Sequence, residues 1–463
     1  MSKGKSSSLG LILCALLSSV VLSQINSGMV NVALNTIMES LNTDVDKVTW
    51  VVTIYLLGYT VFMPIYGRLG DMFGHRQMFL VGVSLFTAGS LLCYLSNSFG
   101  FLIFSRLVQA SGSASFTPMS LAIIANTFPD EKKGQAVGFW GASIGVGAAI
   151  GPTIGGFLIA LGGWNTIFLV GVFAGLTVLF FAFNIIPKAN IPPLENGLDV
   201  LGAVFLTVSL TALLLFLTLG KNIGWLNYPM VLFLVIHIAA LVIFIYWEQR
   251  VLSPLVDLSL IADRVFLSIV MVSFVQMFTQ ISSSILLPLY LLRIAGINPT
   301  TAGFIILFQP AVTSISSPFA GKMVDKYGTR YPVSIGLVSV IVSMLALSII
   351  GEGTSIFYIA AVTSLFGFGC GFCASPLATA STSSTPNEKV GSAIGLYNMF
   401  RYLGSVFGST ITGVILKTRT DRYLAIGHHQ PEAKAVANIY LLLAIVNVFA
   451  FLLSRSFDKK REL

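Results

Sequence analysis

Repeated long runs of apolar residues constrain this chain more than any other feature of its sequence. The hydrocarbon core of a bilayer needs about 20 consecutive apolar residues for each helix that crosses it. Such stretches follow one another along the 463 residues, separated by short loops rich in charge, Gly and Pro. Only 10% of the residues are charged, against about 25% in an ordinary soluble domain. Water cannot be the solvent for most of this surface, so we expect an all-α membrane protein.

The apolar runs predict fourteen transmembrane helices, which would put both ends of the chain on one side of the membrane. The basic opening MSKGKSSS leads into an apolar stretch that is too long for the core of a secretory signal, so we interpret that stretch as the first span. The loops and tails on the side of the termini hold most of the Lys and Arg residues, which predicts that both termini are cytoplasmic. The expected spans are 9–34, 48–69, 78–96, 100–127, 134–161, 164–187, 197–220, 228–248, 264–293, 300–322, 331–351, 354–377, 389–417 and 435–455.

Two sets of residues recur at nearly one spacing along the chain. The first set consists of Gly67, Asp71, Gly74, Arg76 and Gly82, and it recurs as Gly321, Asp325, Gly328, Arg330 and Gly336. The second set consists of Gly134, Gly138, Gly147, Gly151 and Gly156, and it recurs as Gly391, Gly395, Gly404, Gly408 and Gly413. Two independent matches at nearly the same offset predict two parallel, pseudo-symmetric six-helix halves, 9–187 and 264–455. The helices at 197–248 would form a hairpin inserted between them, in a 6+2+6 arrangement.

These motifs resemble those of the major facilitator superfamily, in particular its fourteen-span drug:proton antiporters, over nearly the whole chain. The loop Gly67-Arg68-Leu69-Gly70-Asp71-Met72-Phe73-Gly74-His75-Arg76 resembles the first signature of that superfamily, except that Met72 replaces a basic residue. The resemblance implies the major facilitator fold and an inner latch. A carboxylate there can bridge to basic residues or to the positive N-terminus of a neighbouring helix. The latch residues would be Gly67, Asp71, Gly74, Arg76, Asp325 and Arg330.

A second resemblance concerns the direction of transport. The span 134–161 holds Gly147, Gly151, Pro152, Gly155 and Gly156 in the spacing of a motif that the family's exporters carry and its importers generally lack. Small residues at such positions allow close helix contact, and a proline frees a backbone carbonyl and can bend the helix. The resemblance therefore implies an exporter.

Proton coupling is the difficult point of the sequence, because the predicted spans hold no Asp or Glu near their middle. The segment Met29–Leu34 resembles a motif of the fourteen-span group, but Asn26 stands where relatives carry Asp, and an amide cannot take up a proton. Asn31 lies on a polar stripe that leads to Glu39 at the outer end of the span. We hypothesise that Glu39 is the proton acceptor; the alternative is a solvated carboxylate at a helix end.

Arg106 would lie deeper in the membrane than Glu39. The segment that begins at Arg106 resembles the family's Arg-x-x-Gln-Gly-x-Gly motif, with Ala110 in place of the first Gly. A charge inside a span should face protein or a water-filled cavity. The alternative is an Arg that snorkels to the interface. The predicted proton-coupling residues are therefore Glu39, Arg106, Asn26 and Asn31, of which Glu39 is the one that could carry the proton.

Polar residues within the spans predict a substrate chamber between the two halves. Arg401 lies in the middle of a span, and no acid near the middle of any span can neutralise it, so a water-filled cavity or backbone carbonyls must solvate it. The candidate chamber residues are Gln24, Gln276, Gln280, Gln309, Tyr397, Asn398 and Arg401. Amides among aromatic and Met side chains suit a permissive site for flat amphiphiles.

The sequence thus predicts a secondary active transporter of the multidrug efflux type, which exports amphipathic drugs or toxic compounds in exchange for protons by alternating access. The alternative is a proton-coupled exporter of a dedicated lipid-like or anionic metabolite, favoured by the missing acid at Asn26 and by Arg401. An enzyme or a receptor would need a catalytic cluster or a sensor domain, and the sequence shows neither.

The expected partners follow from the same composition. We expect a monomer in the plasma or inner membrane that uses the proton gradient and no cofactor. Cys370 and Cys373 form a C-x-x-C motif in a Gly-rich apolar run, which favours helix packing over a metal site. Basic residues are spread over short loops, so a nucleic-acid partner is not expected.

Overall fold

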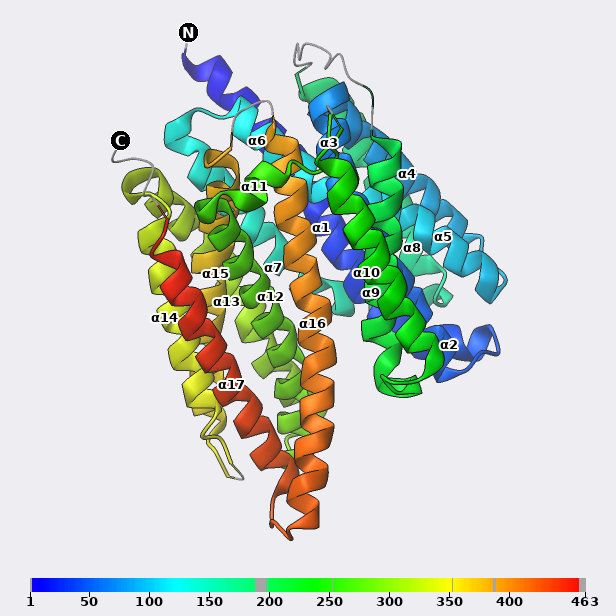
Figure 1. Cartoon of the computed structure of the whole chain (residues 1–463), viewed down its shortest axis with the longest axis vertical. Helices are drawn as coiled ribbons and strands as arrows, with labels where there is room; N and C mark the ends of the chain where they lie inside the picture. Colours follow the sequence, from blue (N-terminus) through cyan, green and yellow to red (C-terminus); the bar gives the residue numbers. More distant parts are fainter. Residues whose placement is uncertain are drawn as a thin grey trace.

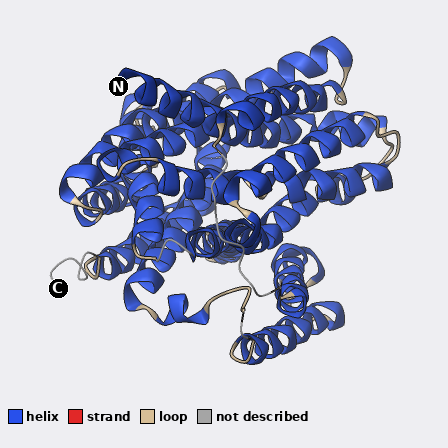
Figure 2. Ribbon diagram, turned by 90° about the horizontal axis from the view of Figure 1, so that it is seen from above, coloured by secondary structure: helices blue, strands red, loops and turns tan. Residues whose placement is uncertain are grey.

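The computed structural model describes residues 2–187, 197, 199–251, 253–351, 353–385 and 389–457. Helices account for nearly all of this part of the chain (Figure 2), because a backbone in lipid must satisfy its own hydrogen bonds. The helices are α1 (Ser2–Ser40), α2 (Val45–Val48), α3 (Trp50–Phe73), α4 (His75–Tyr94), α5 (Phe99–Ser113), α6 (Phe116–Thr127), α7 (Asp130–Gly162), α8 (Thr166–Ile185), α9 (Val200–Ile223), α10 (Tyr228–Glu248), α11 (Leu258–Ala262), α12 (Arg264–Leu289), η1 (Tyr290–Ile294), α13 (Pro299–Tyr327), α14 (Arg330–Leu347), α15 (Ile356–Ser383), α16 (Val390–Ala425) and α17 (Pro431–Ser454).

Thirteen helices of the described part are long and apolar enough to cross a membrane, one fewer than the sequence predicts. The difference lies in the predicted span 100–127, which is divided into α5 and α6 by a turn at Ala114 and Ser115. With 15 and 12 residues, neither piece alone reaches the length of about 20 residues that a bilayer requires. The 6+2+6 layout and its boundaries stay predictions, and the connection 188–196 lies outside the described residues.

Both termini lie at one end of the bundle, which we call the termini side (Figure 1). The helices run between this side and the opposite one, and α9 and α10 form a hairpin at the periphery that contacts α3 and α16 through α9. The helix α16 has 36 residues, about 54 Å at the usual rise. That length exceeds the roughly 30 Å hydrocarbon core of a bilayer, and the α16–α17 connection projects farthest from the termini side.

Polar side chains begin several helices by accepting hydrogen bonds from their free N–H groups. Asp263 accepts from the backbone N–H of Val265 and Phe266 at the start of α12, and Asn298 accepts from that of Thr301 at the start of α13. Glycines end two corresponding helices. Gly74 after α3 and Gly328 after α13 have φ of +97° and +77°, a region that favours glycine. The recurring loop thus has matching backbone geometry in both copies.

Candidate functional site

Asp71 joins α3 to the beginning of α16, a helix that lies far from it in the sequence. Its Oδ1 accepts a hydrogen bond from the backbone N–H of Gly391 at 2.8 Å. Its Oδ2 accepts from the backbone N–H of Ser392 at 2.8 Å and from the Ser392 hydroxyl at 2.6 Å. The first N–H groups of a helix have no partner of their own and attract negative charge. The Asp71 carboxylate therefore caps α16.

Asp325 makes the corresponding connection from α13 to the first turns of α7. Its Oδ1 accepts from the backbone N–H of Gly134 at 2.6 Å, and its Oδ2 accepts from that of Gln135 at 2.9 Å. The two contacts are reciprocal, because each joins a helix of the segment before the hairpin to one of the segment after it. The predicted latch residues Asp71 and Asp325 thus both lie at the seam between these two segments, on the termini side.

Glycines allow the backbones to cross closely beside each carboxylate. A Cβ on Gly67 would collide with the backbone of Gly391, and one on Gly395 would lie 2.9 Å from the carbonyl oxygen of Met63. At the other crossing, a Cβ on Gly321 would collide with the backbone of Gly134. At these two crossings, the recurring glycines of one segment are therefore paired in space with those of the other.

The remaining latch residues lie at the neighbouring helix ends. Arg76 donates hydrogen bonds to the carbonyl oxygens of Ile186 at 2.7 Å and Phe183 at 2.6 Å, so its charge caps the C-terminus of α8. Arg330 begins α14, and its side chain is exposed. His75 lies 3.2 Å from Asp71 through its Nε2.

The predicted antiporter motif forms the contact between α7 and α1. A Cβ on Gly147 would lie 2.6 Å from the Cβ of Gln24, and one on Gly155 would lie 2.8 Å from the Cα of Met29. Gly28 meets Pro152 and Gly151 at the same seam, with 2.9 Å between a Cβ on Gly28 and the Cδ of Pro152. A Cβ on Gly156 would meet nothing within 4 Å. Four of the five motif residues therefore lie against α1.

Arg106 is 1% exposed and has neutral partners. Its Nε donates to the carbonyl oxygen of Val51 at 3.1 Å, and its Nη1 donates to Oδ1 of Asn26 at 3.0 Å and to Oε1 of Gln109. Its guanidinium also lies 4.2 Å from the ring centroid of Tyr55, at cation–π distance. Amide and carbonyl oxygens together with an aromatic ring replace the acid that the sequence lacks.

Glu39 and Asn31 lie apart from Arg106. Both are exposed, and Glu39 follows Asn26 by roughly three and a half helical turns along α1. The structure thus brings Asn26 and Arg106 into contact and leaves Glu39 and Asn31 on the surface. Gln24, from the same predicted stripe, packs against α7.

Four of the predicted chamber residues, Gln276, Gln280, Tyr397 and Arg401, line one cavity between α12, α15 and α16. The cavity measures about 20 Å³, close to the minimum that holds one water. Ser273 and Cys370 line it as well, and sequence reasoning did not select them. Side chains therefore nearly fill this cavity, and all of its lining comes from the segment after the hairpin.

The other predicted chamber residues border this cavity or lie farther away. Gln309 lies beside Cys370. Asn398 is fully buried and donates to the carbonyl oxygen of Ile394 at 2.9 Å, within its own helix. Gln276 donates to Oδ1 of Asn447 at 3.0 Å, which connects α12 to α17.

Arg401 differs from Arg106 in its partners. It is 8% exposed, and none of the described residues is a hydrogen-bond partner of its Nη1. The guanidinium lies 5.8 Å from the ring centroid of Trp140 and 5.9 Å from that of Tyr402. A buried donor without an acceptor is costly, so this charge is available for a group that enters the chamber.

A row of tyrosines, which sequence reasoning missed, lies between the two arginines. Tyr55 and Tyr59 stack with ring centroids 5.9 Å apart, and Tyr59 meets Tyr402 edge-on at 4.8 Å. Tyr55 contacts Arg106 and Tyr402 contacts Arg401. The spacing of Tyr55 and Tyr59, four residues apart on one helical face, was the available signal.

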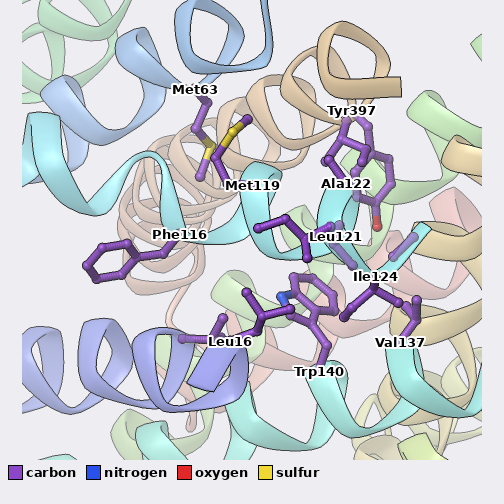
Figure 3. Close-up of a cluster of buried hydrophobic side chains, with 14 of the residues drawn as sticks. Leu16, Met63, Phe116, Met119, Leu121, Ala122, Ile124, Val137, Trp140 and Tyr397 are labelled. Atoms are coloured by element: carbon purple, nitrogen blue, oxygen red, sulfur yellow. The ribbon is translucent and has the colours of Figure 1, made fainter. Parts of the chain in front are cut away.

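Apolar side chains fill the space next to this row. Figure 3 shows Leu16, Phe116, Leu121 and Trp140 together with Tyr397 in one buried cluster. These residues come from α1, α6, α7 and α16, so the cluster draws on both segments of the chain. Together with the carboxylate caps, it closes the termini side of the seam.

Comparisons with known proteins agree with this architecture. A family profile described as Major Facilitator Superfamily matches residues 16–409 and 269–461. The multidrug resistance protein Stp of Mycobacterium tuberculosis (strain CDC 1551 / Oshkosh) is 32% identical over 388 residues, which cover 84% of this chain and 72% of that protein. The riboflavin transporter RibZ of Clostridioides difficile (strain 630) is 28% identical over 402 residues, which cover 86% of each.

Two solved structures share the arrangement of helices. The human organic anion transporter MFSD10 (TETRAN) superimposes with a TM-score of 0.65 at 13% identity, covering 97% of this chain and 99% of that one. The proton:xylose symporter XylE superimposes with a TM-score of 0.66 at 14% identity, covering 98% and 96%. The all-helical major facilitator fold is thus confirmed. The chain belongs to the major facilitator superfamily and is a membrane transporter rather than an enzyme.

Proposed function

We propose that this transporter exports amphipathic compounds in exchange for protons, as a fourteen-span drug:proton antiporter would. Two six-helix halves, 9–187 and 264–455, would rock about the central chamber, with the hairpin 197–248 inserted between them. The termini side would face the cytoplasm of the cell whose plasma or inner membrane holds the protein. The chain would work as a monomer that is driven by the proton gradient and needs no cofactor.

The chamber at Arg401 is the observation that carries this proposal. It combines Tyr397, two amides and one buried charge, and the rings of Trp140 and Tyr402 lie beside that charge, a composition that suits flat amphiphiles with a polar group. The Asp71 and Asp325 caps lie at the seam beside it, where reversible contacts would serve as a gate. The name of Stp, multidrug resistance protein, supports export of varied compounds, and the name of RibZ supports an aromatic, polar substrate.

Proton flux in proteoliposomes tests this function. Purified protein is reconstituted with a pH-sensitive dye trapped inside, a proton gradient is imposed, and cationic, neutral and anionic aromatic compounds are added in turn. We expect at least one compound to accelerate proton movement, with the effect lost in Arg401→Ala. Transport of a compound without proton movement would contradict the antiport, and no response to any compound would contradict the proposed substrate class.

We further propose Glu39 as the external proton acceptor, since it is an exposed carboxylate at the far end of α1 from the termini side. In Glu39→Gln we expect the pH dependence of transport to shift or disappear. Transport in Glu39→Gln with an unchanged pH dependence would remove this residue from the mechanism. Asp44, an exposed acid on the same side that pairs with Lys47, provides a control as Asp44→Asn.

A second candidate, export of an anionic metabolite, is favoured by the excess of hydrogen-bond donors around the chamber. Arg401 Nη1, Trp140 Nε1 and Gln309 Nε2 are buried and have no partner. A substrate rich in acceptors would satisfy them, and a carboxylate would also neutralise Arg401. A cationic substrate would add like charge to a closed, poorly hydrated space.

Three matched probes separate these candidates: 2-naphthoate, 2-naphthalenemethanol and 2-naphthylmethylamine, which share a ring system and differ in charge. Binding is measured by isothermal titration with purified protein. An anion site predicts that the carboxylate binds about tenfold tighter than the amine, a difference of about 1.4 kcal/mol. Arg401→Gln should abolish this preference and Arg401→Lys should retain part of it. Tighter binding of the amine would exclude the anionic candidate.

A further inference from the structure

Two buried carboxylates lie outside the chamber, at the base of the α9–α10 hairpin. Asp199 directly precedes α9 and is 7% exposed, and Glu248 ends α10 and is 4% exposed. Because the hairpin returns to the side from which it started, the two residues meet on the termini side (Figure 1). Neither belongs to a motif that the sequence analysis identified.

Both carboxylates converge on Gly202 in the first turn of α9. A Cβ on Gly202 would collide with Oδ2 of Asp199 and would lie 2.9 Å from Oε1 of Glu248. The two acids therefore share one site that has room for no further side chain. Two carboxylates removed from water in one site repel each other, and each pays a desolvation cost when charged.

Arg68 of α3 is the cation that faces this pair. It is 8% exposed, interacts electrostatically with Glu248 and donates a hydrogen bond to Ser253 in the segment after α10. Among the described residues, its Nε has no partner. One positive charge against two carboxylates leaves one negative charge uncompensated in this described cluster, and a single proton would neutralise it.

The hydrogen bonds indicate which carboxylate carries that proton. Oδ1 of Asp199 accepts from the backbone N–H of Gly202 and from Nε1 of Trp247, both at 2.9 Å, which stabilises its ionised form. Glu248 accepts a longer bond from the backbone N–H of Val256 at 3.3 Å, and the backbone N–H of Leu255 also faces it. Oδ2 of Asp199 and Oε2 of Glu248 have no partner within the part of the chain that the structure describes. A proton on Glu248 would supply the missing donor.

We propose that Glu248 and Asp199 form a proton-binding site that holds one proton opposite Arg68. The site lies against α3, which we call the latch helix because it carries Asp71, whose carboxylate caps α16. Arg68 is three residues from Asp71 on this helix. With the proton bound, the cluster is electrically neutral and the base of the hairpin packs dry against α3. Loss of the proton leaves a buried negative charge, which favours admission of water and a looser contact between the hairpin and the latch helix.

Infrared difference spectroscopy of the full-length protein in lipid nanodiscs reads this proton directly. The wild-type protein is titrated from about pH 6 to about pH 9, above the range in which ordinary exposed carboxyls titrate. We expect one carbonyl band of a protonated carboxylic acid that is lost during the titration. Absence of such a band in the wild type would overturn the proposal, whatever the behaviour of the variants.

Variants assign the band. Glu248→Gln should remove it, and Arg68→Met should move its midpoint to higher pH, because the opposing cation is gone. Asp257→Asn, which removes an acid of the same segment outside the cluster, should leave it in place. A band that persists in both Glu248→Gln and Asp199→Asn would also overturn the proposal. Since the band reports protonation and not transport, failure of the antiport test would leave this result standing.

Discussion

Arg106 and Arg401 are both buried cations in an apolar layer, and their different partners separate their roles. Arg106 is held by Val51, Asn26 and Gln109, and its removal would leave two buried amides with unpaired oxygens. Arg401 has a free Nη1 and aromatic neighbours. The first is built into its surroundings, whereas the second borders a cavity.

We therefore expect Arg106→Met to lower the free energy of unfolding by about 1–3 kcal/mol, the usual cost of leaving buried polar groups without a partner. Arg401→Met should cost clearly less stability and should impair substrate binding more. Thermal unfolding in detergent and probe binding, measured on both variants, check the contrast. An equal loss of stability in the two variants would contradict it.

Asp257 gives a pH dependence outside the membrane-spanning helices. Partial burial raises the pKa of its carboxyl, but hydrogen bonds from Lys389 and Ser259 outweigh that effect and hold the pKa below its ordinary value. A carboxyl with a lowered pKa in the folded state stabilises the protein at pH values above its unfolded pKa of about 3.9. This stabilisation is lost as the pH falls through the lower, folded value.

We expect Asp257→Asn to cost at most about 1 kcal/mol at neutral pH, because the Lys389 side chain of this ion pair is 46% exposed. The difference in unfolding temperature between wild type and variant should shrink as the pH is lowered below about 4. Unfolding curves recorded over a pH series measure it. A difference that grows toward acid pH would show that the carboxyl is not stabilised by this pair.

Sequence reasoning found most of the chamber but not the row of tyrosines between the two arginines. Charge and amides in an apolar run mark positions that cannot face lipid, so Gln276, Gln280 and Arg401 could be selected and do line one cavity. Tyr59 carries no such mark, since an aromatic residue in a span is equally suited to lipid or to packing. Its place between the arginines depends on the crossing of α3 and α16, which no local pattern specifies.

At the scale of elements, the face of the helix on which a glycine lies decides whether close packing against the neighbouring helix requires it. Gly155 and Gly156 are neighbours in the antiporter motif, yet a Cβ on Gly155 would lie 2.8 Å from the Cα of Met29, and one on Gly156 would meet open space. Backbone atoms cannot turn aside as a flexible side chain can. The α1–α7 contact therefore depends on one of the two residues.

Gly155→Val should destabilise the protein by about 1–3 kcal/mol, the usual cost of overpacking a close contact. Gly156→Val should change stability little, because the added side chain faces outward. The pair is its own control, since both changes add the same atoms to adjacent residues of one helix. Equal unfolding temperatures for the two variants would mean that α1 and α7 do not pack as described.

The sequence predicted the elements better than their ends and breaks. Apolar length alone locates a span, which is why thirteen of the fourteen expected ones correspond to single long helices. The division of α5 from α6 was missed, although Pro118 cannot donate a hydrogen bond to the carbonyl of Ala114 and so disfavours one continuous helix there. Tertiary contact accompanies the break: a Cβ on Gly82 of α4 would collide with Ser115 at this point.

At the scale of the whole molecule, the internal repeat becomes an interlocking pair of caps. The repeat relates Asp71 to Asp325 and Gly134 to Gly391, and in space each Asp caps the helix that carries the glycine of the other repeat. The sequence predicted the relation but not which helix end each carboxylate would reach. Because the two caps lie on the same side of the chamber, they hold that side closed together.

This arrangement predicts that weakening both caps opens the chamber toward the termini side. Cys370 provides the readout, since it is 6% exposed and lines the central cavity. In a background in which Cys14, Cys93 and Cys373 are replaced by Ser, Cys370 should react slowly with a water-soluble maleimide. The double variant Asp71→Asn, Asp325→Asn should react several-fold faster, because an amide keeps the shape but loses the charge that the helix N-termini attract.

The labelling rates of the two single variants then show how much each cap contributes to keeping the termini side closed. Asp71 accepts three hydrogen bonds from α16 and Asp325 accepts two from α7. Asp71→Asn should therefore raise the labelling rate more than Asp325→Asn, and the double variant should exceed either one. Asp130→Asn, an acid at the start of α7 that is not one of the caps, is the control. If Cys370 labelling in the double variant stayed at the background rate, the caps would not be what holds the termini side shut.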